Sequence, residues 1–408
     1  MPISLENGRQ RIAWAMSRMP LLHRLRERFT AERPFAGRRI SMSIHLEAKT
    51  ACLAILLRDG GATVSVTGSN PLSTQDDIAA ALAEESGVEV FARHAVSDEE
   101  YTRHLQQTVA DAPELILDDG GDLVQLLHAS PQPQVIGGCE ETTTGVARLR
   151  RLAHEGHLLF PMFAVNDARM KALFDNRYGT GQSVWDGIFR ATNLLIAGKT
   201  VLVVGFGWCG RGIAQRAAGL GARVLVSEVD PVRAMEAWME GYRVAPVQEA
   251  ISEADLVITA TGCTDAVSRE ALTQAKDGLV LCNAGHFNVE IKPSSLEELA
   301  ARHRPVRAGV EEYTLEDGRR LFLLGEGRLV NLALGDGHPV EIMDLSFALQ
   351  ALTLEHLVRS PGLAPGVYPV PKRIDEAVAR MKLESLDVRI DQLTDDQTEY
   401  LGWEGDGA

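Results

Sequence analysis

The sequence predicts an α/β protein built from two doubly wound, Rossmann-like domains with a cleft between them. Short apolar runs of strand length alternate with segments of helical period over most of the chain. Several of these runs end in glycine or polar clusters, as loops at the carboxyl ends of parallel strands do. The chain has 408 residues, which is more than one hydrophobic core usually accommodates. We therefore expect two domains rather than one.

Composition and charge exclude several classes of protein. Hydrophobic residues make up 45% and charged residues 24% of the chain, as in soluble globular proteins. The formal net charge of −15 argues against a nucleic acid or an anionic membrane as partner. The sequence contains neither an apolar run of membrane-spanning length nor a signal-peptide pattern, so we expect a cytoplasmic protein. The five cysteines show no metal-type or redox-type spacing, so we expect reduced thiols and no metal site.

The first 165 residues follow the alternation of helix and strand. The arginine-rich N-terminus has its apolar residues at helical spacing and predicts an amphipathic helix. Apolar runs of strand length lie at 62–66, 115–117, 135–136 and 158–165. Polar clusters occupy 67–70, 118–122 and 140–144. In a doubly wound sheet such clusters line the ligand crevice, which predicts a binding site in this half.

A dinucleotide-binding pattern begins in the middle of the chain. Four aliphatic residues at 201–204 predict a buried strand, and a segment of helical period follows. Between them stand Gly205, Gly207 and Gly210, which suit a tight turn, a close approach to a pyrophosphate, and close packing of helix on strand. Glu228 ends the next apolar run, where a carboxylate accepts hydrogen bonds from ribose hydroxyls and would repel the 2′-phosphate of NADP. The pattern therefore predicts an NAD site.

The remaining elements complete the predicted architecture. Further apolar runs at 257–262 and 279–286 continue the second sheet, and the Pro/Gly-rich stretch 361–371 predicts a linker. We expect a discontinuous substrate-binding domain, an NAD-binding domain and a C-terminal segment. Their predicted bounds are 1–180 with 338–370, then 181–337, and finally 371–408.

The polar clusters and the glycine motif together resemble the S-adenosylhomocysteine hydrolase family, in its shorter archaeal and thermophilic-bacterial branch. The resemblance is carried by segments spread over nearly the whole chain. They are His45, 70–76, 118–122, 140–145, 166–167, 171–176, Gly205 with Gly207, 285–290, 326–331 and 337–339.

The resemblance implies an enzyme that reversibly hydrolyses the thioether of S-adenosyl-L-homocysteine to adenosine and L-homocysteine. It also implies one tightly bound NAD per subunit, which oxidises the ribose 3′-hydroxyl, makes the C4′ proton acidic and is restored after elimination and water addition. The substrate is then a small nucleoside thioether. Two other classes remain open: an NAD-dependent dehydrogenase of the 2-hydroxyacid type, and a non-catalytic NAD-binding regulator.

The resemblance implies catalytic roles for six residues. Lys171 and Asp175 stand four residues apart and share one face of a helix. We expect burial to lower the pKa of Lys171, so that it can accept the 3′-hydroxyl proton. Asp119 and His45 match the family's acid/base residues near C4′ and C5′. The remaining two, His286 and Asn176, match residues beside the ribose and nicotinamide.

The resemblance also implies binding roles. Glu141, Lys171 and Asp175 would hold the ribose, and His338 matches a gate residue near the purine. The predicted cofactor contacts are Thr142, Thr143, Thr144, Asn176, Gly205, Gly207, Gly210, Glu228 and Asn331.

Two positions leave the identity of the purine open. Glu47 and Lys49 stand where the common form of the family has a Thr and a Glu or Gln facing adenine. A carboxylate and an ammonium complement the N1–H donor and O6 acceptor of hypoxanthine, which favours S-inosyl-L-homocysteine as an alternative substrate. In the other interpretation, Glu47 and Lys49 pair with each other and the backbone recognises adenine.

The last residues also depart from the family pattern. Most members end in a Lys/Tyr-bearing tail that reaches the NAD of a neighbouring subunit, whereas this chain ends in 401–408 without such a tail. A homo-oligomer, a tetramer, is what the resemblance implies. The departure leaves the intersubunit contact and the NAD affinity open.

Overall fold

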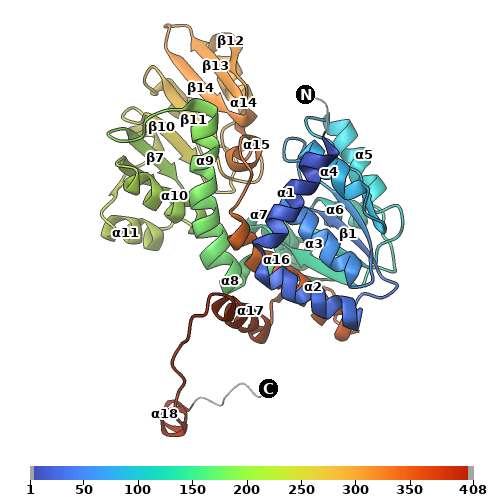
Figure 1. Cartoon of the computed structure of the whole chain (residues 1–408). Helices are drawn as coiled ribbons and strands as arrows, with labels where there is room; N and C mark the ends of the chain where they lie inside the picture. Colours follow the sequence, from blue (N-terminus) through green and yellow to red (C-terminus); the bar gives the residue numbers. More distant parts are fainter. Residues whose placement is uncertain (1–3, 403–408) are drawn as a thin grey trace.

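A computed structural model describes residues 4–402 and contains two separate sheets (Figure 1). The first sheet has seven strands in the order β15-β6-β5-β4-β1-β2-β3, and all its pairs are parallel. Its strands are β1 (Arg39–Ser43), β2 (Thr63–Thr67), β3 (Val88–Val90), β4 (Leu115–Asp118), β5 (Gly137–Glu140), β6 (Pro161–Ala164) and β15 (Gly366–Pro369).

The second sheet has eight strands in the order β12-β13-β14-β11-β10-β7-β8-β9, and only the pairs that involve β12 and β13 are antiparallel. Its strands are β7 (Thr200–Val204), β8 (Arg223–Ser227), β9 (Arg243–Val244), β10 (Leu256–Thr259), β11 (Leu279–Asn283), β12 (Ala300–Arg307), β13 (Val310–Leu315) and β14 (Arg320–Leu324). Within each sheet the first six parallel strands in chain order follow the arrangement 3-2-1-4-5-6 typical of dinucleotide-binding folds. The predicted α/β class with two doubly wound domains is confirmed.

Helices cover both sheets and connect them. Those of the first half are α1 (Leu5–Ser17), α2 (Pro20–Glu32), α3 (Ala48–Asp59), α4 (Asp76–Ala83), α5 (Asp98–Thr108), α6 (Asp122–Ala129), α7 (Thr143–His154), α16 (Val340–Arg359) and α17 (Lys372–Ser385). Those of the second half are α10 (Trp208–Gly219), α11 (Pro231–Met239), α12 (Val247–Ala250), α13 (Arg269–Thr273), α14 (Pro293–Leu299) and α15 (Val330–Ala333). The two halves are joined by α8 (Arg169–Lys171), the π-helical segment Ala172–Gly179 and α9 (Thr180–Thr192), which run on without a break, and α18 (Asp395–Leu401) lies near the C-terminus. The predicted boundary at residue 180 falls inside this continuous helical run, and the domain limits stay a prediction.

Each half buries a core of its own. In the second half Val201 and Val203 pack on one face of the sheet, while Leu202 and Val204 pack on the other. Successive residues of a strand point to opposite faces, so an uninterrupted apolar run marks a strand buried on both sides. None of the helices within residues 4–402 is long and apolar enough to cross a membrane.

Two predicted elements differ from the structure. The fifth strand is β5 rather than 135–136, because it begins with Gly137 and Gly138 and lacks an apolar run. The stretch 361–371 is not a linker, because β15 within it pairs with β6 and extends the first sheet. An edge strand tolerates Pro369 at its end, since one side of its backbone needs no sheet partner.

Candidate active site

The topological switch points of the two sheets determine where the crevices lie. In the first sheet the order reverses between β1 and β4, and His45 and Asp119 follow directly after these two strands. In the second sheet it reverses between β7 and β10, and Gly205 follows β7. Ligands of doubly wound sheets bind outside the carboxyl ends of the strands at such points.

A buried group of two histidines and one aspartate joins the halves. His45 Nε2 lies 3.4 Å from Asp119 Oδ2, and His286, from the loop after β11, brings its Nδ1 to 3.8 Å from Asp119 Oδ1. Gly120 passes so close to the His286 ring that a Cβ there would overlap it. Ser69 Oγ lies 2.9 Å from the second ring nitrogen of His45. The predicted acid/base residues are therefore together, although 3.8 Å leaves Asp119 and His286 without a direct hydrogen bond.

Burial sets the charge of this group. It lowers the pKa of His286 to about 3, with Arg148 and Arg328 adding to the effect. Burial, followed by the charge of His286, also lowers the pKa of His45. Burial, followed by the charge of Glu141, raises the pKa of Asp119 well above its ordinary value. Near neutral pH the two rings are neutral and the carboxyl group retains a proton readily, which suits a proton relay.

Lys171 is the centre of a second buried group. Its Nζ donates a hydrogen bond to Asn176 Oδ1 at 2.8 Å and lies 3.2 Å from Asp175 Oδ1 and 3.3 Å from Glu141 Oε1. The π-helical segment is wider than an α-helix, so residues four and five positions beyond Lys171 both face its ammonium group. The predicted pair thus forms, with Asn176 and Glu141 added to it.

The predicted direction of the Lys171 pKa shift is wrong. Burial acts to lower this pKa, but the charges of Asp175, Glu141 and Asp119 together raise it above its ordinary value. The pKa of Asp175 moves the other way: burial acts to raise it, and Lys171 and His338 more than offset that effect. Lys171 is therefore an ammonium in this arrangement, and it can accept a proton only after a carboxylate partner is drawn away.

Helix α16 supplies two site residues that the sequence did not single out. Ser346 Oγ donates to Asp175 Oδ2 at 2.5 Å, and Gln350 Nε2 donates to Glu141 Oε2. Both are fully buried, one helical turn apart. Two polar residues four positions apart in the otherwise apolar stretch 345–351 of this helix were the available signal.

His338 and Asn331 lie at the junction with the second half. His338 Nδ1 is 2.8 Å from Asp175 Oδ1, and its Nε2 is 3.2 Å from Thr180 Oγ1. Asn331 donates to Ser183 Oγ at 3.2 Å, while its buried Oδ1 has no hydrogen-bond partner within residues 4–402. An unpaired buried acceptor suits a ligand amide group.

The glycine loop after β7 has the shape of a pyrophosphate cradle. Gly205 has φ +97°, and a Cβ there would lie 2.7 Å from Ala260 O. At Gly210 a Cβ would overlap the Gly205 carbonyl oxygen, so the helix packs directly on the turn. Gly207 is the N-cap of α10, whose free amides and dipole attract an anion. These residues fit a dinucleotide.

The other predicted cofactor residues flank this loop. Glu228, after β8, accepts hydrogen bonds from the amides of Phe206, Val229 and Asp230 at 2.6 to 3.0 Å. The carboxylate is thereby fixed beside the glycine loop. Thr142 caps α7 by accepting from Gly145 N at 2.9 Å.

The next two threonines, Thr143 and Thr144, differ in their surroundings. Thr143 Oγ1 donates to Asn166 Oδ1 at 3.3 Å. Thr144 Oγ1 would lie 3.5 Å from a Cβ built on Gly262 of the other half. Thr144 thus lies beside the second half, whereas Thr143 contacts the first.

Glu47 and Lys49 pair with each other. Lys49 Nζ lies 2.7 Å from Glu47 Oε2 and donates to Asp336 O at 2.7 Å. Glu47 is also the N-cap of α3, where it accepts from the amides of Lys49 and Thr50. Both side chains are buried. The structure thus agrees with the interpretation in which these two residues form an ion pair.

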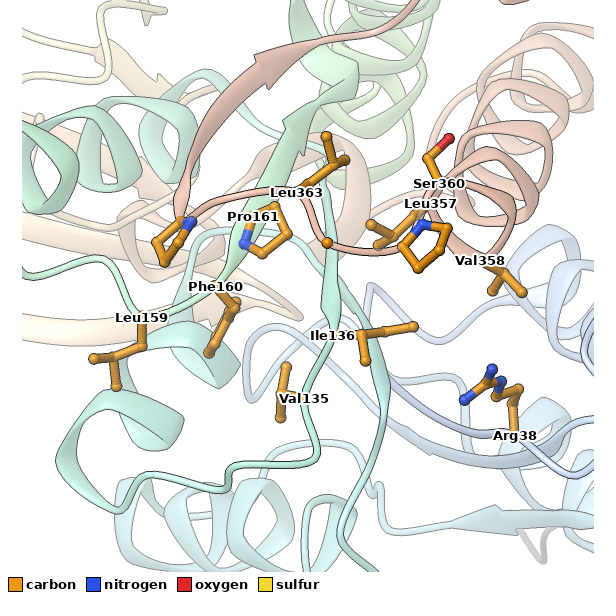
Figure 2. A pocket seen from close by; sticks show the side chains of 13 residues that line it. Arg38, Val135, Ile136, Leu159, Phe160, Pro161, Leu357, Val358, Ser360 and Leu363 are labelled. Carbon is orange, nitrogen blue, oxygen red and sulfur yellow. The ribbon is translucent and has the colours of Figure 1, made fainter.

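A separate hollow lies at the opposite ends of the strands. It has a volume of about 300 Å³ and is lined by apolar residues such as Ile136, Phe160 and Leu357 (Figure 2). Ile136 precedes β5, and Phe160 precedes β6. The hollow is therefore at the amino ends of these strands, away from the residues described above.

Comparisons with known proteins agree with the geometry. The model of S-adenosyl-L-homocysteine hydrolase matches residues 3–136, and the model of its NAD binding domain matches residues 176–337. The adenosylhomocysteinase of Thermotoga maritima is 55% identical over 401 residues, which cover 97% of this chain and 99% of that protein. The S-inosyl-L-homocysteine hydrolase of Methanopyrus kandleri is 53% identical over 409 residues, covering 99% and 96%.

A solved structure supports the fold alone. A dipicolinate synthase chain from Bacillus halodurans superposes with a TM-score of 0.50 at 13% identity, covering 80% of this chain and 99% of that one. The family models and the near full-length relatives carry the stronger conclusion. The chain is an enzyme of the S-adenosyl-L-homocysteine hydrolase family, and its second half is that family's NAD-binding domain.

Proposed function

We propose that the protein reversibly hydrolyses the thioether of S-adenosyl-L-homocysteine to adenosine and L-homocysteine. The observation that carries this proposal is the proximity of the Lys171 group to the His45, Asp119 and His286 group. The charge of Lys171 acts on the pKa values of both His45 and Asp119. One site thus contains a proton acceptor for the ribose 3′-hydroxyl, Lys171, and a group that can move protons at C4′ and at the leaving sulfur.

The chain's own residues bind the ribose and move protons. When bound, NAD would supply a reversible acceptor for a hydride from the ribose. Glu141 and Asp175 accept hydrogen bonds from the ribose hydroxyls, which draws them from Lys171 and lowers its pKa. Lys171 then takes the 3′-hydroxyl proton. Asp119 and His45 move the protons at C4′ and at the C5′ leaving group and water.

The choice of purine depends on Glu47 and Lys49, and S-inosyl-L-homocysteine is the second candidate. It is supported by the activity for which the Methanopyrus relative is named, since that relative is about as similar as the Thermotoga one. Oε2 of Glu47 already receives the Lys49 amide and ammonium group. Oε1 receives the Thr50 amide, while the Thr50 hydroxyl donates to His45 O at 2.6 Å. The helix cap and the ion pair therefore occupy most of the carboxylate that would face the N1–H group of hypoxanthine. Lys49 retains one N–H, which suits adenine N1 or hypoxanthine O6. We therefore favour the adenosyl substrate.

Two measurements test the assignment. The protein is purified without added cofactor and assayed for co-purifying NAD, and each thioether is then added while thiol release and nicotinamide absorbance are followed. We expect released homocysteine with a transient reduced band and faster turnover of the adenosyl substrate. Sustained NADH release without thiol would identify a dehydrogenase instead, and faster turnover of the inosyl substrate would reverse the purine assignment.

We further propose a cytoplasmic homo-oligomer, a tetramer. The five cysteines are free thiols within the described chain, which fits a reducing compartment. Helix α11 exposes Val232, Met235, Trp238 and Met239 at helical spacing. Exposed apolar side chains grouped on one surface can mark an interaction site. The segment that ends in α18 extends from the body (Figure 1), and α18 has no buried residue. Contacts with another copy would cover both surfaces.

A further inference from the structure

Two buried carboxyl groups lie beneath the site and have no role in the chemistry proposed above. Asp118 ends β4 and Glu140 ends β5, and the two residues are neighbours in the register of the sheet. Both have 0% of their surface exposed. Carboxyl groups are almost never buried so completely unless they are bound by partners.

The partners of both groups are the loops that carry the site. Glu140 Oε1 accepts from Gly120 N at 2.8 Å and from Thr142 N and Oγ1 at 3.0 Å. Asp118 accepts from Asp119 N at 3.1 Å and from Val124 N at 2.9 Å. Glu140 thereby reaches across from its own strand to the loop that follows the neighbouring one. It ties the Asp119 loop to the loop that contains Glu141 and Thr142.

The charged groups that shift the pKa values of the two carboxyl groups are acidic. Arg148 lies next to them, where it donates to Gly120 O at 2.8 Å and pairs with Asp122. Burial is the largest cause that raises both pKa values. For Asp118 the charge of Asp122 adds to it, and the pKa rises to about 7. For Glu140 the charge of Asp118 and then that of Asp119 add to it, and the pKa rises well above its usual range. Cys139 and Tyr101 are the other titratable neighbours, and both have raised pKa values. Two like charges in a dry site are costly, so the pair retains one proton.

We propose that Glu140 is a positioning residue, which holds Asp119 between His45 and His286 by binding the Gly120 and Thr142 amides with one carboxyl oxygen. The proposal rests on the proposed thioether chemistry. Asp119 lies 3.4 Å from His45 and 3.8 Å from His286. Small displacements of its loop alter both separations.

The test compares Glu140→Ala with Glu140→Gln. Glutamine retains an acceptor oxygen, and with Asp118 ionised the pair keeps the same total charge. We expect E140Q to remain within about threefold of the wild type, and E140A to lose at least about tenfold in kcat with little change in KM, because misplacing a reacting group by about 1 Å is that costly. Leu127→Ala in α6 is the matched control, since Leu127 is equally buried but belongs to an apolar cluster of the first half.

Two readouts separate positioning from a purely structural role. In E140A, exchange of the nucleoside C4′ hydrogen with deuterated solvent slows, whereas reduction of the bound nicotinamide on adding adenosine is retained, because Lys171 serves that step. Amide hydrogen exchange of 119–121 rises in E140A and stays low in E140Q and L127A. If E140A does not fold, Glu140→Asp, which keeps the carboxyl group but shortens its reach, takes its place.

The proposal is overturned if E140A loses no more kcat than L127A, or if both partial reactions slow equally. Failure of the proposed function is recognised separately, because the wild-type protein would then release no thiol. In that case the amide-exchange difference still reports whether Glu140 holds the loop.

Discussion

The protonation state of Lys171 depends on how many carboxylates lie near its ammonium group. The spacing of Lys171 and Asp175 is visible in the sequence, and a helix makes them neighbours. Glu141 follows a different strand, and only the fold brings it to 3.3 Å. The charges of Asp175, Glu141 and Asp119 together outweigh burial, so the pKa rises rather than falls. The residue could be predicted from sequence, but its charge could not.

Lys171→Met tests the assigned proton acceptor. We expect thioether hydrolysis to fall by at least about 100-fold, because general-base catalysis contributes about 10²- to 10⁴-fold. NAD should still co-purify, since the glycine loop lies in the other half. Lys276→Met, on the surface of that half, is the control and should retain activity in a thiol-release assay. Undiminished hydrolysis in the Lys171 variant would exclude this role.

His286 predicts a pH dependence of stability. Its pKa is about 3 in the folded protein and about 6.5 in an unfolded chain. Between these values the unfolded state binds the extra proton, so the free energy of unfolding falls as pH decreases from about 6.5 towards 3. In His286→Asn we expect this slope to decrease by up to about 1.4 kcal/mol per pH unit. Denaturant unfolding at several pH values measures it, and an unchanged slope would contradict the assignment.

Other residues show the same limit of sequence reasoning. The spacing of Glu47 and Lys49 leaves two arrangements open, and only the structure shows the ion pair of 2.7 Å. Ser346 and Gln350 come from a helix far along the chain. The order of the motifs along the chain does not show which strand ends this helix packs beside in the folded protein. The hydrogen-bond and ion-pair partners that tertiary contacts bring to a site residue therefore could not be predicted from the sequence.

Among the elements, uninterrupted apolar strands were predictable and glycine-rich ones were not. The strand β7 and its loop follow from four aliphatic residues and three glycines. In β5, Gly137 and Gly138 replace the apolar signal, because a Cβ at either would overlap a neighbouring carbonyl oxygen. The π-helical segment likewise has no sequence signature, although it aligns Asn176 with Lys171. An element whose packing requires glycine, or whose helical geometry is irregular, therefore lacks the apolar pattern by which it could be predicted from sequence.

The contact between α10 and the loop after β7 leads to a prediction for this element. Gly210→Ala places a Cβ against the Gly205 carbonyl oxygen, so we expect a lower unfolding temperature and less co-purifying NAD. Gly219→Ala in the same helix meets nothing within 4 Å and should stabilise the protein by up to about 1 kcal/mol. Thermal unfolding and NAD content of the purified proteins measure both. Equal NAD content in the two variants would refute the role given to Gly210.

At the scale of the whole molecule, both halves repeat one strand order, and site residues from both halves follow the carboxyl ends of strands. The alternation of strand-like and helical segments, together with the length of the chain, was sufficient to predict this architecture. Assembly is different, because it depends on which exposed side chains form a continuous surface. Helix α11 became recognisable as such a surface only when its exposed face was known.

Trp238→Asp tests whether that face of α11 is an interface between copies of this chain. Trp238 is 64% exposed beside Met235 and Met239, whereas Trp14 on α1 is 61% exposed and has the guanidinium group of Arg18 over its ring. A buried charge in an apolar interface is costly, so Trp238→Asp should lower the mass measured by light scattering, while Trp14→Asp should leave it unchanged. Each variant removes an equally exposed indole, so general loss of solubility affects both. An unchanged mass for Trp238→Asp would mean that α11 forms no contact between copies of this chain.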